Sequence, residues 1–341
     1  MTGSDWGPGV MHRRRATHSP GLRTIGTTPL QARPLPSQPR LTPPARLAVV
    51  GLGALGLPMA INLQAAGYSL RVHTRSRSAE KDPGLAASRA CATPAEAASS
   101  CEALLLCVSD DAAVEAVLWG ENGAGPALAA GSLVIDCSTV SPACARAMAE
   151  RLAARGIRFI DAPVTGGTEG AKAGTLTVLC GGTSAELERA RPLLEVIGGS
   201  VHHFGPVGAG QQVKAINQVL VAGSYAAVAE AIALGQHLGL AMEPVVAALR
   251  QGAAGSWALE HRATAMLNDS YPLGFKLALH HKDLEIALAT AAEAGLELPL
   301  TAAVRDQEQA LMQQGLGDAD VSALRRSLPP AATAPLDSPL A

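Results

Sequence analysis

The chain has 341 residues, of which 48% are hydrophobic and only 3% aromatic, and a formal net charge of -2. Its length fits one large or two ordinary domains, and its charge, without a basic stripe, argues against nucleic-acid binding. No uninterrupted apolar run of about 18 residues occurs, so we expect no membrane span. The six cysteines form no Cys-x-x-Cys pair and no cluster with zinc spacing, which favours reduced thiols in a cytoplasmic protein and predicts no metal site.

Residues 1–45 lack apolar periodicity and are rich in Pro, Ser, Thr and Arg, with Asp5 as their only acidic residue. Such a composition cannot bury enough surface to fold, so we predict a disordered N-terminal extension. Arg-rich, acid-poor leaders also resemble organellar transit peptides, and import into an organelle is the alternative. Residues 327–341 are predicted to form a second disordered tail.

Residues 46–206 alternate short β-branched runs with helical patterns, which is typical of βαβ units and a mainly parallel sheet. Residues 207–326 contain no convincing strand, and prolines and glycines stand where helices begin and end (Pro244, Pro299, Gly295, Gly315). The sequence therefore predicts an α/β, Rossmann-like domain joined by one long helix to an all-α domain. Strands are expected at 47–50, 70–73, 104–108, 133–136, 158–160 and 175–180.

A Gly-x-Gly-x-x-Gly turn follows the first expected strand and opens a helix, in the run Gly51-Leu52-Gly53-Ala54-Leu55-Gly56. The first glycine allows the tight turn, the second lets the backbone approach a pyrophosphate, and the third lets helix and strand pack closely. The helix N-terminus adds free N–H groups and a positive dipole end. This pattern in this context predicts a dinucleotide site.

The strand after this turn ends at Val72-His-Thr-Arg75-Ser-Arg77, where an NAD-binding protein usually has an acid for the ribose 2′-hydroxyl. No acid stands there, and Arg75 with its neighbours offers a partner for a 2′-phosphate instead. We therefore expect NADP as the cofactor, with NAD as the alternative.

Two loops at strand ends carry hydroxyl groups and glycines. Ser138 and Thr139 follow the strand 133–136, at the sheet edge where ligands bind in open α/β sheets. Capping of the next helix explains their hydroxyl groups equally well. Thr165, Gly166 and Gly167 follow another strand, and their glycines free the backbone to form a concave nest of N–H groups suited to a carboxylate.

Lys214 lies near the start of a long apolar helix and shares one face with Asn217 and Gln218, which stand at i+3 and i+4. An isolated lysine in such a helix is usually a side chain whose ammonium reaches water. Burial at the mouth of the helix would instead lower the pKa of its amine, which suits proton transfer.

The motifs in this order resemble the β-hydroxyacid dehydrogenase family, the short relatives of 6-phosphogluconate dehydrogenase. The resemblance covers about residues 46–326 and rests on runs at 51–59, 136–139, 161–167, 208–218 and 282–284. Its members include 3-hydroxyisobutyrate dehydrogenases, 2-hydroxy-3-oxopropionate (tartronate semialdehyde) reductases and glyoxylate or succinic semialdehyde reductases. The resemblance implies a homodimer or homotetramer that transfers hydride between a nicotinamide and a small carboxylate-bearing substrate, a β-hydroxy acid or its semialdehyde.

The resemblance also implies roles for particular residues. Lys214 would be the catalytic general acid and base, and Asn217 or Gln218 would anchor the substrate beside it. The loop Thr165–Gly167 would hold the substrate carboxylate. Cofactor contacts would come from Thr139, Lys282 and the backbone at Val108 and Ser109, although Lys282-Asp283 by itself indicates an exposed charged pair.

Two other functions remain open from the sequence. A non-catalytic NADP-binding scaffold or redox sensor is one, because some proteins of similar sequence have lost the lysine. An imine reductase, which shares the fold and usually replaces the lysine, is the other. The retained Lys214 and the intact loop at Thr165–Gly167 favour the dehydrogenase.

Overall fold

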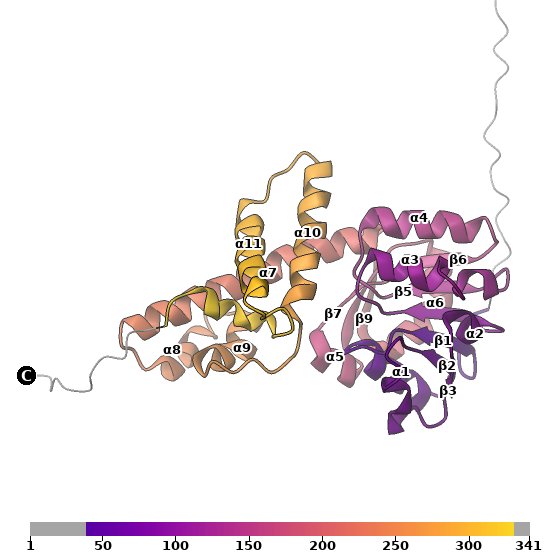
Figure 1. Cartoon of the computed structure of the whole chain (residues 1–341), viewed down its shortest axis with the longest axis horizontal. Helices are drawn as coiled ribbons and strands as arrows, with labels where there is room; N and C mark the ends of the chain where they lie inside the picture. Colours follow the sequence, from indigo (N-terminus) through magenta and orange to yellow (C-terminus); the bar gives the residue numbers. More distant parts are fainter. Residues whose placement is uncertain (1–38, 331–341) are drawn as a thin grey trace, which may run out of the picture. The chain divides into compact units, whose positions relative to one another are not determined.

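The computed structural model describes residues 39–330, which form a parallel sheet with helices on both faces, a small second sheet and a set of helices (Figure 1). The large sheet is parallel throughout and has the order β3-β2-β1-β4-β5-β6. Its strands are β1 (Arg46–Val50), β2 (Ser69–His73), β3 (Arg89–Ala90), β4 (Ala103–Leu106), β5 (Leu133–Asp136) and β6 (Arg158–Asp161). The predicted Rossmann-like fold is confirmed.

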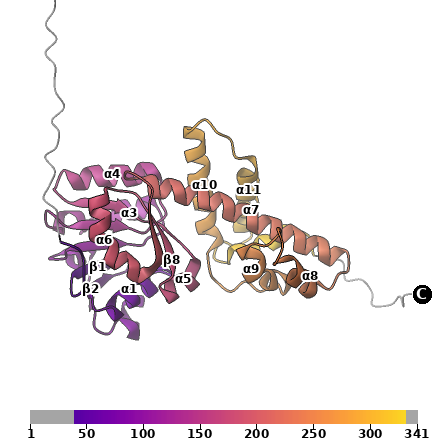
Figure 2. The ribbon, with the colours of Figure 1, turned by 180° about the vertical axis from the view of Figure 1, so that it is seen from behind.

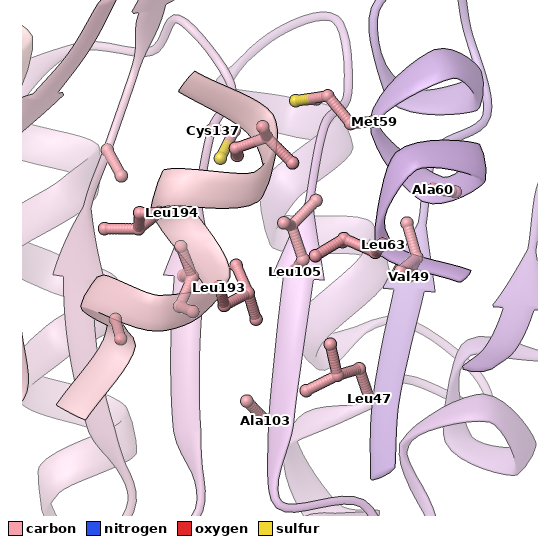
Figure 3. Packing of buried hydrophobic residues seen from close by; sticks show 14 of the residues in the cluster. Leu47, Val49, Met59, Ala60, Leu63, Ala103, Leu105, Cys137, Leu193 and Leu194 are labelled. Atoms are coloured by element: carbon pink, nitrogen blue, oxygen red, sulfur yellow. The ribbon is translucent and has the colours of Figure 1, made fainter. Parts of the chain in front are cut away.

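Both faces of the large sheet are buried because its strands are apolar at consecutive positions. In β1, Leu47 and Val49 pack beneath α1 (Gly56–Ala65) and α6 (Ser184–Ile197), as Figure 3 shows. Ala48 and Val50 of the same strand face the opposite core, covered by α2 (Pro94–Ala98), α3 (Asp111–Trp119) and α4 (Pro142–Ala153). β1 pairs with both β2 and β4, so the strand order reverses there, and ligands bind at the carboxyl edge beside such a point.

The second sheet has the order β7-β8-β9 and was only partly expected from the sequence. It contains β7 (Val164–Thr165), β8 (Leu176–Cys180) and β9 (Gly198–His203), with α5 (Gly167–Ala173) between the first two. β8 was predicted, whereas β7 is two residues long and β9 begins with two glycines, so neither carries a clear alternation of apolar residues. β3, also two residues long, was missed for the same reason.

The predicted long helix is α7 (Ala209–His237), and α10 and α11 pack across it in both views (Figures 1 and 2). The remaining elements are α8 (Met242–Leu249), α9 (Trp257–Leu267), α10 (Leu277–Glu293), α11 (Pro299–Gln313) and the 3-10 helix η4 (Val321–Ser327). Three further 3-10 turns lie in the sheet domain: η1 (Ala79–Lys81), η2 (Pro83–Leu85) and η3 (Gly125–Ala127). By length and composition alone α7 could cross a membrane, and half of its most apolar window is buried within the described chain.

The predicted limits of the terminal segments were wrong where the structure describes them. Leu41 and Ala45 belong to the sheet's core. The Leu41 N–H donates to the Arg189 carbonyl at 2.9 Å, and the Leu41 carbonyl accepts a hydrogen bond from the Tyr68 hydroxyl at 2.9 Å. At the other end, η4 continues through Ser327 and Leu328 packs against the helical core. The remaining parts of both predicted tails, 1–38 and 331–341, lie outside the described residues.

All six cysteines are described, and none of them forms a disulfide.

Two acidic residues lie side by side where β5 and β6 end. Asp136 pairs in register with Asp161, and both side chains are fully buried. One Asp136 oxygen accepts the Ser138 N–H at 2.9 Å, while the other has no hydrogen-bond partner in the described structure. Burial raises the pKa of Asp136 to about 7, the bonds from Ser138 oppose this, and the charge of Asp161 adds to the increase.

We expect Asp136→Asn to make the protein more stable at pH 8 but not at pH 4. A raised pKa means that the folded state binds the proton more tightly than the unfolded chain, so wild-type stability falls as pH rises from about 4 to about 7. Asparagine keeps the bond to Ser138 and never ionises, so the variant escapes this loss, which is on the order of a few kcal/mol. Urea unfolding at both pH values measures the difference, and an equal effect at pH 4 and pH 8 would contradict the account.

Candidate active site

The glycine turn after β1 has the geometry that a dinucleotide requires. Gly51 has φ +98°, and a Cβ there would lie 2.2 Å from the Cys107 carbonyl oxygen. A Cβ on Gly56 would lie 1.9 Å from the Gly51 carbonyl oxygen, so α1 packs against the turn only because this residue is glycine. At Gly53 nothing lies within 4 Å, which leaves open space where a ligand would approach the backbone.

Some helices of the sheet domain have a side chain that caps their N-terminus, and others leave their first N–H groups available to an anion. The starts of α2, α3, α4 and α6 are each capped by a side chain (Thr93, Asp110, Ser141 and Thr183). No side chain caps α1 or α5, the two helices that follow the predicted pyrophosphate turn and the predicted carboxylate loop. Their first N–H groups can therefore serve an anion, so the residues present fit a dinucleotide at α1.

The end of β2 contains an acidic residue that sequence reasoning did not place there. Glu80 is buried, accepts the Thr74 N–H at 2.8 Å, and pairs with the Arg77 guanidinium at 2.8 Å. Arg77 is therefore neutralised within the turn. Arg75 is exposed and makes no hydrogen bond or ion pair with any residue in 39–330, so of these two arginines it is the one that an added phosphate can reach.

Ser138 does not face open solvent, and its role in substrate binding stays a prediction. Its side chain is buried, and its hydroxyl oxygen accepts the Val108 N–H at 2.9 Å. Ser138 thereby ties the end of β5 to the loop after β4, which carries the exposed Ser109. Thr139 is half-buried, and its carbonyl accepts a hydrogen bond from the Lys282 ammonium of α10.

The predicted carboxylate loop contains two consecutive glycines in conformations that other residues rarely adopt. Gly166 has φ +129° and Gly167 has φ +64°. Both are at least partly exposed, and Thr165, which closes β7, is half-buried. The loop thus presents backbone N–H groups at the uncapped start of α5, as a carboxylate nest would.

Lys214 lies in the second turn of α7, and only 7% of its surface is exposed. Its ammonium forms no hydrogen bond or ion pair within residues 39–330. Burial lowers the pKa of Lys214 from 10.5 to about 8, the nearby charge of Asp283 opposes this decrease, and that of Lys282 adds to it. A buried amine without a partner that titrates near neutral pH is poised to exchange a proton with a ligand.

A chain of polar contacts surrounds this lysine. Gln218 is buried, accepts from the Asn217 amide at 2.7 Å and donates to Asp283 at 2.7 Å. Asp283 is 3% exposed and lies 2.8 Å from the Lys282 ammonium, so the pair is not the exposed one that its sequence indicates. Gln218 is fully engaged inside the protein, and half-buried Asn217 remains the better placed of the two amides to meet a substrate.

The structure therefore gathers most predicted site residues along the carboxyl edge of the sheet and the start of α7. Arg75 and the glycine turn follow β2 and β1, as an extended dinucleotide would require. The sequence does not predict the parts played by Glu80 and Asp283, since isolated acids carry no periodic signal. Within residues 39–330 no group of His, Cys, Asp and Glu side chains has the arrangement of a metal site.

Comparisons with known proteins agree with this geometry. Residues 46–205 match the family model of the NAD-binding domain of 6-phosphogluconate dehydrogenase. Residues 208–328 match a model described as the NAD-binding region of NADP-dependent 3-hydroxyisobutyrate dehydrogenase.

Individual relatives span nearly the whole described chain. The 2-hydroxy-3-oxopropionate reductase of Escherichia coli is 37% identical over 83% of this chain and 97% of its own length. The 3-hydroxyisobutyrate dehydrogenase of Pseudomonas aeruginosa is 35% identical over 76% of this chain and 90% of its own. A solved 3-hydroxyisobutyrate dehydrogenase from Salmonella typhimurium superposes with a TM-score of 0.77 at 30% identity, covering 83% of this chain and 100% of that one.

With two family models covering the sheet and the helices, and with relatives above 30% identity over nine tenths or more of their length, the chain belongs to the β-hydroxyacid dehydrogenase family of the 6-phosphogluconate dehydrogenase superfamily and is an NAD(P)-dependent oxidoreductase.

Proposed function

We propose that this protein transfers hydride between NADP(H) and a small β-hydroxy acid or its semialdehyde, as 3-hydroxyisobutyrate dehydrogenases and 2-hydroxy-3-oxopropionate reductases do. The observation that carries the proposal is the buried, unpartnered Lys214, whose pKa is about 8. A solvated lysine would be almost wholly protonated near neutral pH and could not act as the base, and a lysine paired within the protein would not be available to a substrate.

The proposed chemistry divides between the cofactor and the protein. When bound, the nicotinamide supplies or accepts the hydride. In reduction, the Lys214 ammonium donates a proton to the carbonyl oxygen of the semialdehyde. In oxidation, neutral Lys214 removes the hydroxyl proton of the β-hydroxy acid. The N–H groups of Gly166 and Gly167, with the Thr165 hydroxyl, hold the substrate carboxylate, and Asn217 orients the substrate beside the lysine.

NADP is the proposed cofactor because of the charge distribution at the end of β2. Glu80 engages Arg77 and the Thr74 N–H, so its carboxylate is not free for a ribose 2′-hydroxyl. Exposed Arg75 supplies an uncompensated positive charge for a 2′-phosphate. Thr139, Lys282 and the backbone at Val108 and Ser109 are proposed to contact the nicotinamide half.

An apolar face of α7 supports the proposed homodimer or homotetramer. Ile216 and Leu220 are 61% and 68% exposed. Leu234 and Leu238 lie eighteen residues further on, which is five helical turns and hence the same face, and they are 63% and 65% exposed. Exposed Leu300 of α11 lies beside Gly223 of α7, which extends this face. Exposed Glu230 interrupts this face between Leu220 and Leu234. Its otherwise apolar character suits a second copy related by a two-fold axis.

We expect Lys214→Arg to lower kcat/KM for oxidation by about 100-fold or more, because a guanidinium cannot act as a base. In the wild type, oxidation should rise with pH through about 8 as Lys214 loses its proton, and reduction should fall over the same range. A panel of small β-hydroxy acids and semialdehydes, assayed from pH 6 to 10 with NADP(H), measures both. Lys172→Ala, which removes an exposed lysine of α5, is the matched control. Normal turnover in Lys214→Arg would refute the proposed role.

Arg75→Ala should weaken NADPH binding by roughly 10- to 100-fold, the value of a charged hydrogen bond to phosphate, and leave NADH binding nearly unchanged. NADH is the internal control because it lacks the 2′-phosphate. Titration of both cofactors by fluorescence measures the two affinities. Equal losses for NADPH and NADH, or a wild type that prefers NADH, would contradict the assignment of Arg75.

The double variant Leu220→Glu/Leu234→Glu should convert the oligomer to a monomer, since it places four charges in each two-fold interface. Light scattering after size-exclusion chromatography reports the mass. Glu260→Lys, at an exposed position of α9, should leave the mass unchanged. A monomeric wild type, or an oligomer that survives the double substitution, would show that this face is not the interface.

A further inference from the structure

Three loops of the candidate site are joined to the start of α7 by buried side chains for which no catalytic part has been assigned. Asp161, at the end of β6, accepts the Gly208 N–H at 2.8 Å with one carboxylate oxygen and the Gln211 N–H at 2.9 Å with the other. The helix has no cap from its own side chains, so Asp161 serves as its cap from a distant strand. The carboxylate also lies at the positive end of the helix dipole.

Gln211 continues this connection to the loop after β5. Its side-chain oxygen accepts the Val140 N–H at 3.2 Å, and its amide donates to the Ser138 carbonyl at 2.8 Å. The Ser138 hydroxyl in turn accepts the Val108 N–H at 2.9 Å. Asp161, Gln211 and Ser138 are all at most 2% exposed. We call these three residues the α7 clamp.

The backbone around the clamp leaves no room for α7 to shift toward the sheet. A Cβ on Gly210 would lie 2.2 Å from the Leu179 carbonyl oxygen and 2.8 Å from the Asp161 carboxylate. A Cβ on Gly181 would lie 2.5 Å from the other oxygen of Asp161. The helix start is therefore packed against β8 through two glycines, and the Asp161 carboxylate is closely surrounded and fully buried.

We propose that the α7 clamp is the positioning device of the active site, which fixes Lys214 relative to the carboxylate loop and to the loop that meets the nicotinamide. Asp161 precedes the loop Thr165–Gly167 by four residues, and Gln211 precedes Lys214 by three, less than one helical turn. The inference rests on the proposed function, because it assigns Lys214 as the proton donor whose place is being fixed.

The central test is Asp161→Asn in the full-length protein. An amide has one oxygen and one NH₂ group, so in either orientation one of the two helix N–H groups faces a donor. We expect kcat to fall about 100-fold, the effect of roughly 1 Å of misplacement, with NADPH affinity unchanged because the clamp does not reach β1 or β2. The pH at which oxidation rises, which we assign to deprotonation of Lys214 and call its pH limb, should move from about 8 toward 10.5 as the lysine gains access to water.

A control separates positioning from loss of stability. Thr93→Ala removes the cap of α2 in the same domain, where the Thr93 hydroxyl accepts the Glu96 N–H at 3.0 Å. It should lower the melting temperature without moving kcat or the pH limb. Hydrogen exchange of the Gly208 and Gln211 amides, which needs no substrate, should accelerate in Asp161→Asn and not in Thr93→Ala.

If Asp161→Asn does not fold, Gln211→Met decides the question, because methionine keeps the volume and removes only the two bonds to the loop 138–140. A fall in kcat of about tenfold or more with folding retained supports the clamp. Wild-type kcat and an unmoved pH limb in a folded clamp variant would overturn it. A wild type inactive on every substrate would refute the proposed function instead, and the exchange of the Gly208 and Gln211 amides would still test the clamp.

Discussion

The active-site geometry depends on one buried carboxylate. Asp161 leaves the sheet at the end of β6 and holds the first turn of α7 with both oxygens, so a 29-residue helix is fixed at its N-terminus by a strand of another structural layer. Every group proposed to contact the substrate lies within a few residues of this junction or bonds to α7. Burying a carboxylate is unfavourable unless its oxygens are satisfied, and here two backbone N–H groups do so.

The same junction explains how a lysine becomes useful for proton transfer. Holding the start of α7 against β8 buries Lys214, and burial lowers the pKa of its amine. Asp283 opposes that decrease, and Gln218 fixes the position of Asp283 through a 2.7 Å hydrogen bond. The result is an amine that titrates near pH 8 and retains its hydrogen-bonding capacity for a ligand, at an edge where two uncapped helix starts can bind anions.

Much of this arrangement could be predicted from the sequence because it depends on local rules. The glycine turn, the double glycine at 166–167 and the i, i+3, i+4 stripe at Lys214 each have a spacing with a physical meaning. Contacts between distant residues have no such spacing in the sequence. The burial of Ser138 and Asp283, and the position of the Glu80 carboxylate at the end of β2, therefore could not be predicted. β7 was missed because it is only two residues long, and β9 because it begins with two glycines; strands of either kind depend on pairing with a neighbouring strand.

A direct titration of Lys214 tests whether its amine can serve as the general acid and base. NMR of the reductively methylated protein in the presence of NADP⁺ would follow each lysine, and the signal missing from Lys214→Arg identifies this one. We expect this signal to titrate near pH 8. A pKa close to the ordinary value of 10.5 would mean that Lys214 is solvated or firmly paired, and would contradict its assignment as the general acid and base.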